Sequence, residues 1–127
     1  MNCIFRFFLL LTFCTQLSAT FVRVLLEESD NPVWMLESCC GFQFEDAVTG
    51  KSISLGATHH RLFIKLDKGE LHVNGKKLLK NKIAILPTKR YALFKNKRYD
   101  GGFFLIKADS KYYLINNIER EEYIFSV

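Results

Sequence analysis

Four carboxylates are the side chains best suited to acid–base chemistry. Glu119, Glu121 and Glu122 lie near the C-terminus, and Asp46 lies in the first half of the chain. A carboxyl group can protonate a leaving group or activate a nucleophile when its surroundings adjust its pKa. The three glutamates, however, fall at the start of a predicted helix, where negative charge stabilises the positive end of the helix dipole. We therefore expect structural roles for them and assign no catalytic residue.

The histidines do not form a metal-binding pattern. His59 and His60 are adjacent, so their side chains usually diverge, and His72 has no cysteine, histidine or acid at metal-ligand spacing. The chain also lacks a phosphate-binding glycine loop and a serine in a nucleophile-elbow context. We expect no metal and no cofactor.

The cysteines do not form a disulfide framework. Cys3 and Cys14 lie in an N-terminal leader, which leaves the adjacent pair Cys39 and Cys40. Adjacent side chains of a regular strand point to opposite faces, and a disulfide between neighbours closes a strained eight-membered ring. We expect the pair to be small buried residues, with an intermolecular bridge or a redox role as the alternative.

Residues 1–19 have the layout of a secretory signal. One cation, Arg6, precedes the apolar stretch 7–14, and a polar stretch ends at Ala19. The apolar stretch is much shorter than the roughly 20 residues of a membrane-spanning helix. We expect a cleaved signal and an exported protein, in the periplasm or another extracytoplasmic cell-wall compartment. An uncleaved membrane anchor is the alternative, because Leu17 is large for its position near the cleavage site.

Basic residues concentrate in segment 76–98. This segment contains lysine or arginine at 76, 77, 80, 82, 89, 90, 95, 97 and 98 and no acid. Such a run creates a local positive field, so an anionic polymer is the expected partner. For an exported chain this means acidic cell-wall glycan or an anionic membrane surface, and not nucleic acid. The ordinary alternative is that these lysines solvate exposed strand faces.

Short apolar runs predict an antiparallel β-rich domain over residues 20–127. They occur at 21–26, 33–36, 42–44, 61–66, 71–73, 76–79, 83–86, 91–94, 99–106 and 112–115. Asn74-Gly75 is a strong hairpin signal, and 108–110 predict another turn. Asn116 and Asn117 predict the end of the last strand and the cap of a C-terminal helix. The expected fold class is therefore α+β, with the chain stopping soon after that helix begins.

Segment 99–127 resembles the stage II sporulation protein D family, also called the amidase enhancer or LytB family. The recurring core of this family is a Tyr-x-Gly strand, a second strand ending in Asn, and Leu-Glu-x-Tyr-Leu-x-Gly-Val at a helix opening. The matching residues are Tyr99 and Gly101 in the first element, Asn116 in the second, and Glu121 and Tyr123 in the third. Arg120 and Ser126 replace the usual Leu and Gly.

The resemblance implies an exported peptidoglycan lytic transglycosylase of cell division or sporulation, which cleaves glycan strands that have lost their stem peptides. Its acid–base glutamate would lie beyond Val127, whereas Glu121 and Tyr123 match structural positions. We therefore expect an N-terminal fragment that is inactive as it stands, from a truncated or split gene. The implied partners are peptidoglycan glycan strands and, in addition, amidases or other cell-division proteins.

A second hypothesis is an exported β-domain that binds cell-wall glycan or a division partner without catalysis. In this case the basic segment 76–98 makes the contact, and the candidate glycan-binding residues are Lys95, Lys97, Arg98 and Tyr99. Tyr91 and Tyr112 are further rings on which a sugar could stack, although core packing is the commoner use of such residues.

Overall fold

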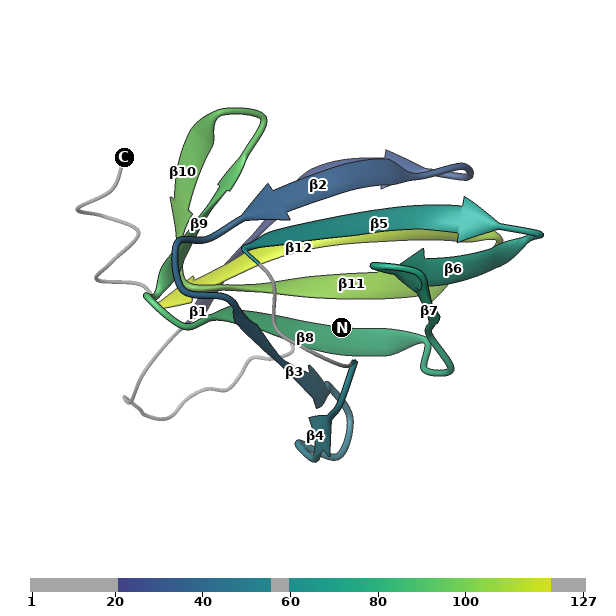
Figure 1. Ribbon diagram of the computed structural model, residues 1–127, viewed down its shortest axis with the longest axis horizontal. Helices are drawn as coiled ribbons and strands as arrows, with labels where there is room; N and C mark the ends of the chain where they lie inside the picture. The colour runs from purple at the N-terminus through teal and green to yellow at the C-terminus, as the bar shows by residue number, and fades with distance from the viewer. Residues whose placement is uncertain (1–20, 56–59, 120–127) are drawn as a thin grey trace, which may run out of the picture.

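The computed structural model describes residues 21–55 and 60–119, and all of its strand pairs are antiparallel (Figure 1). The strands are β1 Phe21–Ser29, β2 Val33–Glu37, β3 Phe42–Asp46, β4 Ser52–Ile53, β5 Arg61–Asp67, β6 Glu70–Val73, β7 Lys76–Lys77, β8 Lys82–Pro87, β9 Tyr91–Phe94, β10 Lys97–Asp100, β11 Gly102–Ala108 and β12 Lys111–Glu119. This confirms the antiparallel β-rich prediction.

No helix occurs in residues 21–55 or 60–119, so these ranges contain no helix that is long and apolar enough to cross a membrane. The predicted C-terminal helix, with Glu121 and Tyr123, lies outside the described residues, as does the predicted signal.

The strands form two six-stranded sheets that share one core. Sheet A has the order β1-β12-β11-β8-β3-β4, and sheet B has the order β10-β9-β2-β5-β6-β7. Alternation along each strand sends one set of side chains inward, as in β5, where Leu62 and Ile64 are buried between exposed Arg61, Phe63 and Lys65. Buried residues of both sheets, such as Trp34, Leu36, Phe42, Ile64, Ile85, Phe103 and Leu114, form one cluster. Both sheets therefore contribute to one core among the described residues.

Tight turns connect four hairpins of the two sheets. Both residues have positive φ in Lys68-Gly69, Asn74-Gly75, Lys95-Asn96 and Asp109-Ser110. Two-residue turns of this kind match the twist of the strands that they join. The predicted turns at Asn74-Gly75 and around Asp109 are thereby confirmed.

The predicted strand end and helix cap at Asn116 are wrong. Strand β12 continues through Asn116, which pairs with Val24 of β1 and Phe103 of β11. Its side chain is buried and donates hydrogen bonds from Nδ2 to the carbonyl oxygens of Asp100 and Gly102, both at 3.0 Å. The amide group that could have capped a helix instead satisfies two backbone carbonyls inside the fold.

These contacts bring the described motif residues together where β10 turns into β11. Gly101 has a φ of +84°, and a Cβ added to it would lie 2.6 Å from the backbone oxygen of Asn117. Tyr99 packs with its ring centroid 6.4 Å from those of both Phe94 and Phe103. We call this arrangement of Tyr99, Gly101 and Asn116 the β10–β11 corner. All three residues have structural roles in this corner.

Candidate functional site

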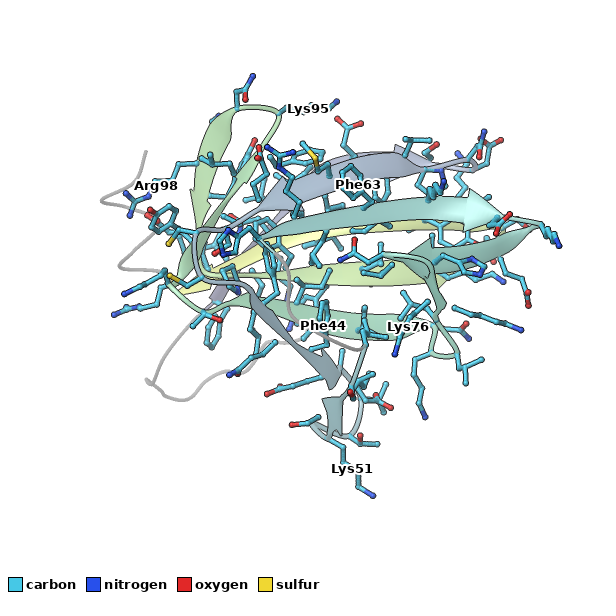
Figure 2. The ribbon with its side chains drawn as sticks, in the orientation of Figure 1. Phe44, Lys51, Phe63, Lys76, Lys95 and Arg98 are labelled. Atoms are coloured by element: carbon cyan, nitrogen blue, oxygen red, sulfur yellow. The ribbon has the colours of Figure 1, made fainter. Side chains whose placement is uncertain are left out.

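The basic segment 76–98 is divided between distant parts of the surface. Lys76 and Lys77 belong to β7, whereas Lys95 and Arg98 belong to the β9–β10 hairpin. Figure 2 shows Lys76 far from Lys95 and Arg98. The segment therefore does not form one continuous patch.

Several of these cations are paired with carboxylates. The ion pairs are Lys77 with Glu70, Lys80 with Asp46, Lys95 with Glu27, and Arg98 with Asp100. Each pair reduces the positive field that the sequence predicts for the segment, and surface pairs of this kind contribute little to stability. The number of basic residues in this segment is therefore not enough to infer that it binds an anionic polymer.

The four predicted glycan-binding residues do not form one site. The Tyr99 ring packs against the core, and the Lys97 ammonium lies 5.6 Å from its centroid. Lys95 lies in the β9–β10 turn and pairs with Glu27 at 2.9 Å. Arg98 is on the opposite face of β10 from Lys97 and Tyr99, because side chains alternate along a strand. Of the four, Arg98 is on the outer face of sheet B.

On that face Arg98 stacks on Tyr91, which was predicted as a ring on which a sugar could stack. Its guanidinium carbon lies 4.2 Å from the centroid of the Tyr91 ring, and its Nε donates to Asp100 Oδ1 at 2.9 Å. The register explains this contact, because Asp100 is paired with Tyr91 and Arg98 with Leu93. Tyr112, by contrast, is buried at 4% exposure, so its ring is not available for a sugar to stack on.

Tyr91 and Leu93 border a hollow of about 340 Å³ on the outer face of sheet B. Its other lining residues are Glu37, Ser38, Cys39, His60 and Arg61. We call it the outer hollow. Glu37 and Arg61 are register partners on β2 and β5, and Arg61 Nε donates to Glu37 Oε2 at 3.2 Å. The wall between β2 and β5 therefore carries both donor and acceptor groups.

A second, more open hollow adjoins the first at Arg61. It is lined by His60, Arg61, Phe63 and Asn74. Phe63 is half exposed, and its ring lies on the outward side of β5 (Figure 2). Asn74 is held in place because its Oδ1 accepts from Phe63 N at 2.8 Å and its Nδ2 donates to Arg61 O at 3.1 Å. The two hollows together place aromatic rings on either side of Arg61.

Ser38 is an unexplained polar group in the wall of the outer hollow. It is only 5% exposed, and its Oγ has no hydrogen-bond partner among the described residues. Leaving a buried hydroxyl unpaired costs about 1–3 kcal/mol. Sequence reasoning missed Ser38, since its burial depends on the packing of the sheet.

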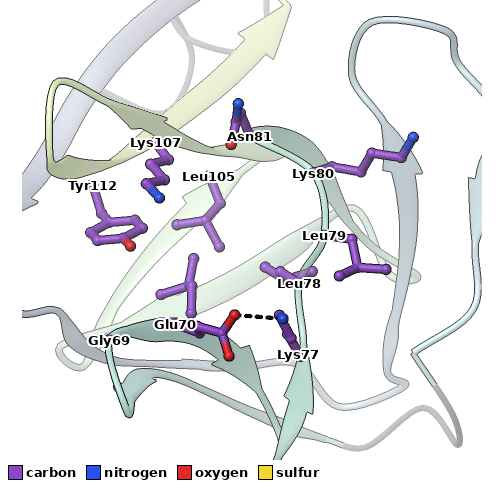
Figure 3. Close-up of a pocket in the computed structure, with 11 residues that line it drawn as sticks. Gly69, Glu70, Lys77, Leu78, Leu79, Lys80, Asn81, Leu105, Lys107 and Tyr112 are labelled. Carbon is purple, nitrogen blue, oxygen red and sulfur yellow. Dashed lines mark ion pairs between the residues drawn. The ribbon is translucent and has the colours of Figure 1, made fainter.

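A smaller cavity of about 200 Å³ lies near β6, β7 and β11 (Figure 3). Its charged residues include Glu70 and Lys77, which pair with each other, so that Lys77 holds the pKa of Glu70 below its ordinary value. Leu78 and Leu105 contribute apolar walls. Glu70, the acid of its lining, is already paired with Lys77, and Tyr112, the ring of its lining, is buried, so we do not select it.

Asp46, the predicted acid in the first half of the chain, has a structural role. Its Oδ1 accepts hydrogen bonds from the backbone N–H of Val48 at 2.8 Å and of Thr49 at 3.3 Å. These bonds, led by the one from Val48, and the nearby Lys80 lower the pKa of Asp46. Asp46 is therefore an ionised turn residue and not a proton donor at neutral pH.

The expectation that Cys39 and Cys40 are buried is also wrong. Both are exposed, because they lie in the turn between β2 and β3 and not in a strand.

Comparison with known proteins identifies no relative: no family model, no curated protein and no solved structure matches the chain.

Proposed function

We propose that this protein is the β-sandwich part of an exported cell-wall protein of the stage II sporulation protein D type. In this proposal the outer face of sheet B binds a glycan strand of peptidoglycan. The outer hollow carries the proposal, because it combines the Tyr91 ring with the Arg61–Glu37 ion pair.

The chemistry of this face matches a sugar ring. The apolar face of a sugar packs against aromatic rings, and Tyr91 and Phe63 lie on either side of Arg61. Hydroxyl and N-acetyl groups need donors and acceptors that are already oriented, and an ion pair such as Arg61–Glu37 supplies both. The outer hollow thus suits a largely neutral carbohydrate better than a strongly anionic polymer.

The family part of the proposal rests on the sequence resemblance alone, and β12 continues past Asn116, where that resemblance implies a strand end. Tyr99, Gly101 and Asn116 are the described residues that carry the family resemblance, and each has a distinct packing or hydrogen-bonding role there. Lytic transglycosylase chemistry is what this family implies for the whole protein. We assign binding to the outer face of sheet B and no acid–base role to the described carboxylates.

Binding to peptidoglycan sacculi tests the proposal. We expect residues 20–127 to co-sediment with sacculi and the Arg61→Ala variant to bind roughly tenfold more weakly, a loss of about 1.4 kcal/mol. Arg23→Ala is the matched control, because Arg23 is an exposed arginine of sheet A. Equal binding by the wild type and Arg61→Ala would exclude the outer face of sheet B as the glycan site.

Ser38→Ala should raise stability and leave binding unchanged. Removing an unpaired buried hydroxyl is expected to raise the free energy of unfolding by about 1 kcal/mol. The Ser38 hydroxyl oxygen is inaccessible from the surface, so sedimentation with sacculi should stay the same. Urea denaturation and the sedimentation assay measure the two properties, with Ser52→Ala, an exposed serine of β4, as control. A variant that is no more stable than the wild type would show that the Ser38 hydroxyl has a partner in the folded protein.

A further inference from the structure

Cys39 and Cys40 lie close enough to react with each other. Their Sγ atoms are 3.1 Å apart and share a hydrogen bond, and both residues are exposed. In a strand they would point to opposite faces, but here they occupy a turn that ends at Gly41, whose φ is +88°. No other cysteine occurs in 21–55 or 60–119.

The turn that carries them is anchored at both ends. Ser38 N donates to His60 O at 2.8 Å, and Thr88 N donates to Gly41 O at 3.0 Å. Cys39 also lines the outer hollow beside Ser38. A covalent change between the two sulfur atoms would therefore alter the backbone between two fixed points, at the rim of the outer hollow.

We propose that Cys39 and Cys40 form a redox-active dithiol that closes reversibly to a disulfide and reshapes this rim. The oxidant is a low-molecular-weight disulfide. One cysteine thiolate attacks a sulfur atom of that disulfide, forms a mixed disulfide and releases one small thiol. The second cysteine thiolate then attacks the protein sulfur of the mixed disulfide and releases the other small thiol. The protein loses two protons and two electrons, and the donor disulfide is reduced to two thiols.

The hydrogen bond with Cys40 raises the pKa of the Cys39 thiol and outweighs the opposing charge of Lys89. Either exposed cysteine can make the first attack. The second attack is intramolecular and starts from a sulfur atom at contact distance, so it should outpace release by an external thiol.

Mass spectrometry of residues 20–127 after treatment with oxidised glutathione tests the reaction. This segment contains all twelve described strands and their shared core and lacks Cys3 and Cys14. The wild type should lose two hydrogens, remain monomeric and recover its mass on reduction. Cys39→Ser and Cys40→Ser should each instead retain glutathione on the remaining cysteine. A stable glutathione adduct or a linked dimer of the wild type would overturn the proposal.

Two further measurements test separately whether the two thiols are close together and whether oxidation reshapes the rim of the outer hollow. A monosubstituted arsenical, phenylarsine oxide, bridges two neighbouring thiols with loss of water, so it should bind the reduced wild type much more tightly than Cys39→Ser. Hydrogen exchange should change at residues 38–41 on oxidation and stay constant in β11 and β12. Equal arsenical binding by the variant would overturn the dithiol, and unchanged exchange at 38–41 would overturn the reshaped rim.

Discussion

Asn116→Ala is expected to lower the free energy of unfolding by about 3 kcal/mol, because it removes the donors to two carbonyls at the β10–β11 corner. Asn116 is 4% exposed, so water cannot readily replace the lost amide. For a domain of this size the change corresponds to a decrease in Tm of roughly 10–20 °C. Trp34, the only tryptophan, is buried and reports unfolding by its fluorescence.

Asn117→Ala is the matched control for this experiment. Asn117 is the next residue of β12 and points outward, where its Oδ1 accepts from the exposed Arg23 Nε at 3.3 Å. We expect this variant to lose about 0.5 kcal/mol or less. Similar losses for the two variants would mean that asparagine matters here through strand propensity and not through the bonds at the corner.

Gly101→Ala is expected to have an effect of similar size, about 3 kcal/mol, for two additive reasons. A φ of +84° strains any residue with a Cβ, which costs about 1 kcal/mol. The added Cβ would also lie 2.6 Å from Asn117 O and 2.9 Å from the Ile118 Cα, both backbone atoms of β12. Backbone atoms of a central strand cannot move aside cheaply, so overpacking adds about 2 kcal/mol. Chemical denaturation measures the loss.

Gly50→Ala separates the two contributions. Gly50 has a φ of +76°, but nothing lies within 4 Å of an added Cβ. We expect a loss of about 1 kcal/mol at this position, from the backbone strain alone. Equal losses at Gly50 and Gly101 would show that β12 does not pack tightly against the corner.

The sequence predicted most strands because the signals are local, but the predicted run 99–106 is wrong, since Gly101 divides it into β10 and β11 of different sheets. Apolar alternation, as in Leu62 and Ile64 of β5, depends on near neighbours along the chain. The turn at Asn74-Gly75 was predictable because both residue types tolerate positive φ. Lys95-Asn96 makes a similar turn, yet lysine gives no such signal, and there the strand pairing imposes the conformation.

Asn116 and Cys39 show where local reasoning failed. The side chain of an asparagine hydrogen-bonds to backbone equally well at a helix end or across a sheet, and only the positions of Asp100 and Gly102 decide between these uses. The usual burial of cysteine predicts that Cys39 and Cys40 are buried, but the turn between β2 and β3 exposes both.

The outer hollow could not be predicted, because its residues come from separate strands. Glu37 and Arg61 meet through the register of β2 and β5, and Tyr91 reaches the same face through β9. Arg98 was predicted as a glycan-binding residue, but its stacking on Tyr91 depends on the β9–β10 register. Pairing between distant strands is fixed by the whole sheet and is not encoded in any short motif.

The pairing of β1 has a consequence for the order in which the molecule assembles. Strand β1 is at the edge of sheet A, and its one neighbour there, β12, is the last described strand. Contacts between such distant segments form slowly, because a long loop must close first. A chain that emerges from its N-terminus, whether from a ribosome or through a membrane pore, therefore exposes β1 unpaired until residues 111–119 have followed it.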